Sequence, residues 1–100
     1  MLFSIQITEE AKNDITEAVG WYRLKAEKLH IRFLDKLEKT LQSIRRNPFA
    51  FKKVYKQFRQ TAVRSFPYVI VYETGQATVL IYAVFNTWQH PGKKLNRLKK

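Results

Sequence analysis

The sequence predicts an α+β domain, in which a small antiparallel-rich sheet has the order strand, helix, helix, strand, strand, strand and a helical hairpin packs on one face. The first observation is the hydrophobic period, which is two at the start, about 3.6 through the middle, and two again after Pro48. The second is the short connection between the two helical stretches, around residues 25–28, which favours antiparallel helices.

One strand and two helices are predicted in the first half of the chain. Residues 3–7 alternate apolar and polar side chains, as in a strand with one buried face, and Thr8 stands at an N-cap position. The second helix must end near Pro48, because proline disfavours helical geometry in the residue before it. Apolar residues at helical spacing mark the two helices: Ala11, Ile15, Ala18, Val19 and Tyr22, then Leu29, Phe33, Leu37, Leu41 and Ile44. We expect three aromatic side chains to pack in the core or the hairpin: Trp21, Tyr22 and Phe33.

The second half of the chain predicts three strands. Their ranges are 57–66, 68–73 and 77–85. A tight hairpin turn is expected between the last two, with Gly75 able to adopt a positive φ. Residues 79–85 are almost continuously apolar, which is typical of a strand that is covered on both faces.

The net charge of +11 is distributed unevenly along the chain. Residues 1–46 carry nine Lys and Arg against seven Asp and Glu, whereas residues 47–100 carry ten against one, Glu73. The second half should therefore attract polyanions or an acidic protein, although solubility alone is the competing explanation. We expect one domain over residues 1–91, followed by a solvated basic tail over residues 92–100.

Composition excludes several classes of function. There is no cysteine, which excludes thiolate chemistry and is compatible with a reducing cytoplasm. The two histidines, His30 and His90, are not spaced as metal ligands. We therefore expect no metal and no cofactor. No apolar run is long enough to span a membrane, and the start turns acidic too early for a secretory signal. Paired carboxylates are absent from the second half. Two possibilities remain: the side chains of Arg, Lys and Tyr act on a phosphate backbone, or the protein catalyses no reaction.

Basic and aromatic residues alternate in the second half, a pattern that is typical of nucleic-acid binding. Arg59 and Arg64 flank one predicted strand, with Tyr68 nearby. Residues five apart in a regular strand point to opposite faces, so the two arginines share a site only if a bulge intervenes. The alternative is that the aromatic rings fill the core and the arginines are solvated. Candidate residues for binding a target or a polyanion are Arg59, Arg64, Tyr68, Trp88, Gln89, Lys93 and Lys94.

Several stretches, in order, resemble the RelE/ParE superfamily of bacterial toxins, and most closely its ParE-like branch. They are "AKNDITEAVGWY", "RFLDKL", "NPF", the isolated Arg59, "FPYVIVYE" and "IYAVFNT", and they extend over about residues 3–91. The resemblance implies a RelE/ParE-like fold and a toxin encoded beside an antitoxin, whose acidic or amphipathic segment wraps the helices and sheet. Some members of this superfamily cleave messenger RNA on the ribosome, while ParE types inhibit DNA gyrase.

One departure separates this chain from the nuclease branch, and a second separates it from many ParE-like relatives. RelE-type nucleases place an arginine directly after the tyrosine that opens the third strand, where it can stabilise charge at the scissile phosphate, and here Val69 follows Tyr68. Many ParE-like relatives read "H-x-x-R" after the last strand, where this chain has Asn86 and Gln89, which carry no fixed positive charge. If the chain is nonetheless an enzyme, the catalytic candidates are Arg59, Arg64 and His90.

Three functions remain open from the sequence. The first is a ParE-like toxin that binds a large target such as gyrase, with Trp88 either an exposed aromatic contact or a core residue. The second is a metal-independent, ribosome-dependent endoribonuclease. The third is a non-toxic nucleic-acid-binding module, whose affinity would fall steeply with salt.

Overall fold

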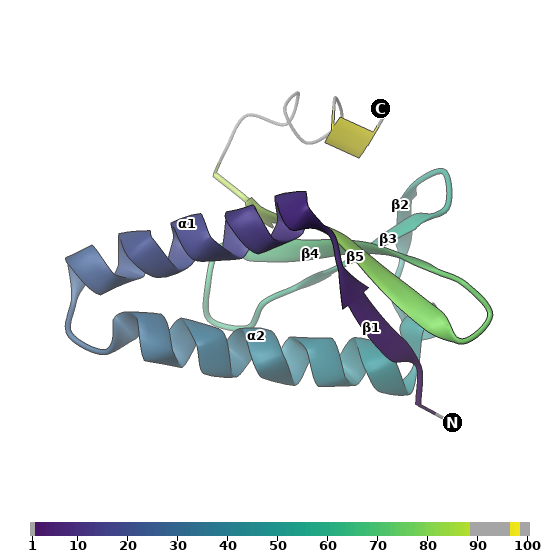
Figure 1. Ribbon diagram of the computed structural model, residues 1–100, viewed down its shortest axis with the longest axis horizontal. Coiled ribbons are helices and arrows are strands. Elements are labelled where there is room, and N and C mark those ends of the chain that lie inside the picture. The colour runs from purple at the N-terminus through teal and green to yellow at the C-terminus, as the bar shows by residue number, and fades with distance from the viewer. Residues whose placement is uncertain (1, 89–96, 99–100) are drawn as a thin grey trace.

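The computed structural model describes residues 2–88, 97 and 98 (Figure 1). A five-stranded sheet has the order β1-β5-β4-β3-β2, with β1 parallel to β5 and the remaining pairs antiparallel. The two helices run antiparallel and cover one face of this sheet, so the predicted α+β architecture is confirmed. The elements are β1 Ser4–Ile7, α1 Glu9–Lys25, α2 Leu29–Arg46, a 3-10 turn Pro48–Ala50, β2 Lys53–Tyr55, β3 Phe58–Ala62, β4 Tyr68–Thr74 and β5 Thr78–Asn86.

The helix boundaries follow from local chemistry. Thr8 caps α1 by accepting a hydrogen bond from the Ala11 amide at 3.1 Å, and α2 ends just before Asn47 and Pro48, as predicted. Between the helices, Lys28 adopts a left-handed conformation with φ of 62°, which reverses the chain within a few residues. This short reversal holds the two helices side by side as a hairpin.

The strand predicted over residues 57–66 is shorter than expected, and one strand was not predicted. β3 ends at Ala62, because residues 63–66 form a turn in which the Phe66 amide donates to the Val63 carbonyl at 3.2 Å and Ser65 has φ of 73°. The additional strand, β2, has three residues and pairs irregularly with β3. Such a strand is too short to show a period in the sequence.

The main hydrophobic core lies between the helical hairpin and the sheet. The rings of Tyr22, Phe33, Phe66 and Tyr68 pack together there, with centroid separations of 5.0 to 6.0 Å. The expected core positions of Tyr22 and Phe33 are therefore confirmed. The expectation for Trp21 is wrong, because its side chain is 53% exposed: it lies one position away from the apolar stripe of α1.

A second, smaller core covers the opposite face of the sheet. The strand β5 contributes to both cores, and its pairing with β4 shifts by one residue at Tyr82, which forms a bulge and changes which side chains face which core. Before the bulge Val79 and Ile81 face the helices, and after it Ala83 and Phe85 face the second core. The buried residues of the second core are Phe58, Val69, Val71, Ala83, Phe85 and Leu98. The prediction that this strand is covered on both faces is confirmed.

Candidate functional site

The candidate site begins where β1 stops and β5 continues with a strand partner on one side only, β4. β1 pairs with β5 only as far as Ile81, so the backbone of β5 beyond that point needs other partners. Helix α1 supplies one: the Asp14 carboxylate accepts a hydrogen bond from the Val84 amide at 2.9 Å. The hydroxyl of Thr8 donates to the Tyr82 carbonyl at 3.3 Å. The N-terminal part of α1 thus replaces the missing strand.

The two described residues of the C-terminal tail pack against this region. Arg97 donates to both carboxylate oxygens of Asp14, at 2.8 and 3.0 Å, lies 3.3 Å from Glu10, and stacks over the Phe85 ring. Leu98 is only 5% exposed and belongs to the second core. The expectation of a solvated tail is therefore wrong for Arg97 and Leu98, because an ion pair and an apolar contact hold them against the domain.

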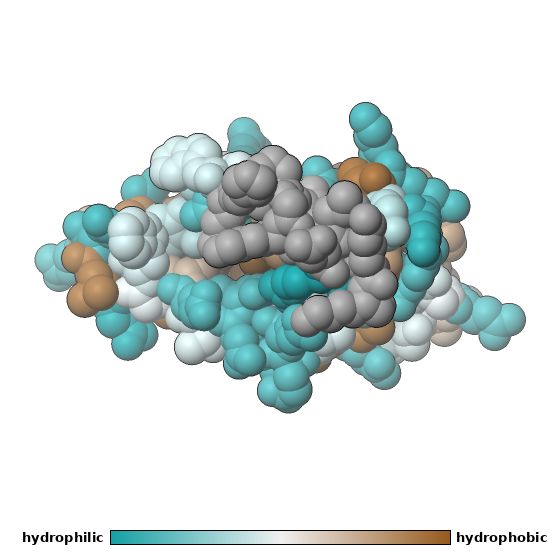
Figure 2. Space-filling model, turned by 90° about the horizontal axis from the view of Figure 1, so that it is seen from above, coloured by the Kyte–Doolittle hydropathy of each residue, from teal (hydrophilic) through white to brown (hydrophobic). Residues whose placement is uncertain are grey.

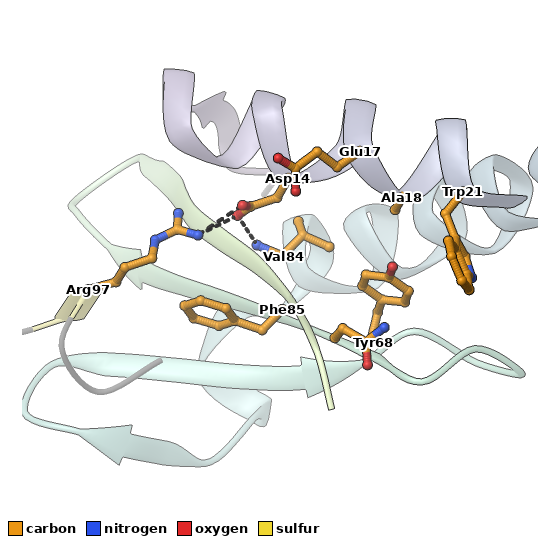
Figure 3. Close-up of a pocket in the computed structure, with 9 residues that line it drawn as sticks. Asp14, Glu17, Ala18, Trp21, Tyr68, Val84, Phe85 and Arg97 are labelled. Carbon is orange, nitrogen blue, oxygen red and sulfur yellow. Dashed lines mark hydrogen bonds and ion pairs between the residues drawn. The ribbon is translucent and has the colours of Figure 1, made fainter. Parts of the chain in front are cut away.

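A groove of about 460 Å³ opens beside this ion pair, between α1 and the end of β5. In Figure 3 the side chains of Asp14, Glu17 and Trp21 line the α1 side, and the Tyr68 ring points from β4 toward α1. The remaining lining residues are Ala18, Val84, Phe85, Asn86 and Arg97. The groove therefore combines a partly apolar floor with a carboxylate at its rim and an ion pair at one end.

A second, more apolar cavity of about 310 Å³ adjoins the first and shares Trp21 and Asn86 with it. Trp88 lines this cavity and is 84% exposed, which decides between the two roles left open for it: the ring is outside the core. Its backbone is nevertheless fixed, because the Trp88 amide donates to the Asn86 side chain at 2.8 Å. The neighbouring Thr87 amide donates to the Pro67 carbonyl at 2.7 Å. We call the surface formed by Trp21, Pro67 and Trp88 the tryptophan surface.

Figure 2 shows the molecule from above, where hydrophilic residues dominate the visible face. Hydrophobic residues stand out at the end at which α1 meets α2. In that part of the chain Leu24 is 85% exposed, and Trp21 lies one helical turn before it. Large apolar side chains exposed this close together are typical of a surface that contacts a partner.

The guanidinium group of Arg59 has structural partners in and beside the 3-10 turn. Its Nη1 donates to the Phe51 carbonyl at 2.6 Å and to the Phe49 carbonyl at 3.4 Å, and the group lies over the Phe49 ring. Beside it the hydroxyl of the buried Tyr72 donates to the Pro48 carbonyl at 2.6 Å. Arg59 and Tyr72 therefore hold the 3-10 turn against the sheet, a role that the sequence did not indicate.

The structure does not bring the described candidates Arg59, Arg64 and Tyr68 together in one cavity. Arg64 is exposed and lines a groove beside α2; Arg59 does not line this groove, although Phe51, whose carbonyl accepts from Arg59, does. Tyr68 is 7% exposed and packs in the main core, so little of its ring is available for stacking on a base. The other candidates, Gln89, His90, Lys93 and Lys94, lie outside the described residues.

Among residues 2–88, 97 and 98 there is no group of three or more His, Asp or Glu that could hold a metal ion. None of the helices in this part of the chain is long and apolar enough to cross a membrane. The resolved pKa shifts belong to tyrosines: burial raises the pKa of Tyr22, with Tyr68 adding to the effect, and burial raises the pKa of Tyr72 to about 12, opposed by the positive charge of Arg59. A raised pKa keeps a phenol neutral and suits a structural role.

Comparisons with known proteins identify relatives. Residues 5–90 match the family described as the ParE toxin of the type II toxin-antitoxin system parDE. Among solved structures, one described as the chromosomal ParDE TA system from P. aeruginosa is similar, with a TM-score of 0.75 at 9% sequence identity. That match covers 85% of this chain and 96% of the other, and at this identity it shows the fold alone. A search of curated proteins gives no match.

Replacing Tyr72 by Phe tests its role in holding the 3-10 turn. The change leaves the buried Pro48 carbonyl without its partner, so we expect a loss of about 1–3 kcal/mol in the free energy of unfolding at pH 7. Because the folded pKa exceeds the ordinary value of 10.0, the stabilisation is complete below pH 10 and is lost as the pH rises toward 12. Urea unfolding at pH 7 to 12 should show the wild type and Y72F converging. A constant difference across this range would contradict the assignment.

Substitutions at Asp14 test whether its carboxylate both completes β5 and fixes the tail. Asp14→Ala removes both contacts and should cost about 2–3 kcal/mol, whereas Asp14→Asn keeps an acceptor for the Val84 amide and should cost less. Arg97→Met removes the guanidinium group, with its contacts to Asp14, Glu10 and the Tyr82 carbonyl, but leaves the hydrogen bond between Asp14 and the Val84 amide. Urea unfolding of D14A, R97M and the double variant should give non-additive losses. Additive losses, or equal losses in D14A and D14N, would show that the two contacts are not joined through Asp14.

Proposed function

The chain belongs to the ParE toxin family of type II toxin–antitoxin systems, and we propose that it is a toxin that binds DNA gyrase and does not cut RNA. Its antitoxin neutralises it in the same cytoplasm. Uncharged or already bonded side chains occupy the positions where the nuclease branch carries its charge.

One observation supports binding most strongly. The residue after Tyr68, where RelE-type nucleases carry an arginine, is Val69, which is 8% exposed and packs in the second core with Phe58 and Phe85. Arg59, the arginine of β3, already donates to two backbone carbonyls. A guanidinium group that is committed to the fold would have to leave these acceptors before it could stabilise a scissile phosphate. This arrangement favours a toxin that acts by contact.

The tryptophan surface is the proposed contact for gyrase. Trp21 and Trp88 are both more than half exposed, they border one apolar cavity, and the turn that carries Trp88 is fixed by hydrogen bonds. An aromatic ring on a fixed backbone loses little conformational entropy on binding, which is why tryptophan is enriched among the residues that dominate interface energies. The basic second half of the chain raises the association rate and orients the encounter.

The antitoxin segment that we propose is acidic or amphipathic. The net charge of +11 attracts an acidic chain, and the groove between α1 and β5 offers apolar surface from Ala18, Val84 and Phe85. A segment laid in this groove would also cover Trp21, which borders both cavities. Neutralisation would then follow from competition for the same surface that contacts the target.

Purified protein should inhibit DNA supercoiling by gyrase, and Trp88→Ala should weaken that inhibition about thirtyfold, the effect of losing about 2 kcal/mol at a dominant contact. The free energy of unfolding should change by less than about 0.5 kcal/mol, since the ring is 84% exposed. Leu2→Ala is the control, because Leu2 is also more than half exposed but lines neither cavity and is not part of the exposed surface around Trp21 and Leu24. Unchanged supercoiling with the wild type, or equal inhibition by W88A and the wild type, would reject the proposal.

A further inference from the structure

The outer edge of β3 is covered along only part of its length. β2 pairs with β3 at Phe58 and Arg59, and the Gln60 amide donates to the Lys52 carbonyl at 3.1 Å. Because residues two apart in a strand direct their backbone groups to the same side, Ala62 presents its amide and carbonyl on this outer edge. Within residues 2–88, 97 and 98, no strand pairs with Ala62 on that side. The edge is therefore open for about one pairing position.

A groove of about 350 Å³ lies along this open edge, with β3 as one wall and helix α2 as the other. Every ionisable side chain that lines the groove is a cation: Lys36 and Lys39 from α2, and Arg64 from the turn after β3. Lys39 is 3.2 Å from Asp35, in a pair that is more than half exposed and therefore weak. The other lining residues are Thr40, Ser43, Phe51, Thr61 and Ala62.

The position of Arg64 is set by the backbone. It is the second residue of the turn over residues 63–66, which is closed by the hydrogen bond between the Phe66 amide and the Val63 carbonyl. The positive φ of Ser65 completes this turn, and the Val63 amide donates to the Tyr68 carbonyl at 2.9 Å. Arg64 thus starts from a fixed point at the mouth of the groove, directly beyond the open edge at Ala62.

We propose that this groove binds an extended acidic peptide segment of a partner protein, which adds to the outer edge of β3 at Ala62 while its carboxylates pair with Lys36, Lys39 and Arg64. The backbone edge selects the class of partner. An incoming peptide strand satisfies both the amide and the carbonyl of Ala62, whereas a phosphate can accept from the amide only. The cations select acidic side chains on that strand.

The inference does not depend on the identity of the toxin's target. The groove shares no lining residue with the two cavities beside Trp21, so a partner can occupy it whether or not the tryptophan surface contacts gyrase. A failure of the gyrase assay would leave this proposal intact. Conversely, a groove that binds no peptide would leave the gyrase proposal intact.

The test uses the full-length, isotope-labelled protein, made by cell-free synthesis, and NMR titration of its backbone amides. The probe is a capped heptapeptide of alternating Val and Glu, compared with the same peptide carrying Lys for Glu. We expect the Glu peptide to shift the amides of Thr61, Ala62 and Lys36, and the Lys peptide to leave them unchanged. A Glu peptide that is N-methylated at its central residues should bind far more weakly, because it cannot pair with a strand edge.

Matched charge reversals separate the groove from general attraction to a basic protein. Arg64→Glu should lower the affinity for the Glu peptide about fivefold or more, since it removes one attraction and adds a repulsion. Arg46→Glu makes the same change at an exposed position of α2 that lines none of the three cavities, and it should have little effect. Equal losses in R64E and R46E, or N-methylation without effect, would overturn the proposal. So would an oligothymidylate that shifts the groove amides more strongly than the peptide does.

Discussion

The strand β5 lies between β1 and β4 and is buried on both faces, and the bulge at Tyr82 determines which side chains reach which core. If the bulge were absent, the alternation set by Val79 and Ile81 would continue, and Ala83 and Phe85 would face the helices. The second core would then lose its central residues. The same shift places the Val84 amide where Asp14 can accept from it. The packing of the helices, the second core and the C-terminal residues is therefore coupled through one irregularity in one strand.

This constraint also positions the candidate site. β1 ends early, so the last part of β5 depends on side chains from α1 and from Arg97 for its polar contacts. The chain leaves β5 through Asn86, whose side chain fixes the backbone of Trp88. An exposed tryptophan thus follows two residues after the end of a strand that is buried on both faces. Such a design suits recognition of a large partner, because the contact residue is held without being buried.

The sequence predicted the elements correctly where the hydrophobic period extends over many residues. Both helices, the last two strands and the two-sided burial of β5 were correct, because each has many residues that repeat one period. β2 was missed because three residues cannot display a period, and the turn after Ala62 was missed because a positive φ at Ser65 has no signature in that residue type. Trp21 could have been found, since it lies one position away from the apolar stripe of α1.

The candidate site was less predictable, because its contacts join residues that are far apart in the chain. Asp14 and Arg97 are separated by 83 positions, and Arg59 reaches carbonyls of a 3-10 turn that no side-chain pattern marks. Residue types do not indicate which backbone carbonyls a side chain will bind, so the sequence predicted that Arg59 binds a polyanion. Val69, in contrast, could be judged from the sequence, because the question concerns a single position: the sequence has valine where the nucleases have arginine, and the structure buries that valine.

If this toxin acts by contact and leaves RNA intact, as we propose, primer extension on messenger RNA from translating ribosomes should give the same products with and without the purified protein. New stops at defined codon positions, lost when Arg59→Ala protein is used instead, would show that the toxin cuts RNA.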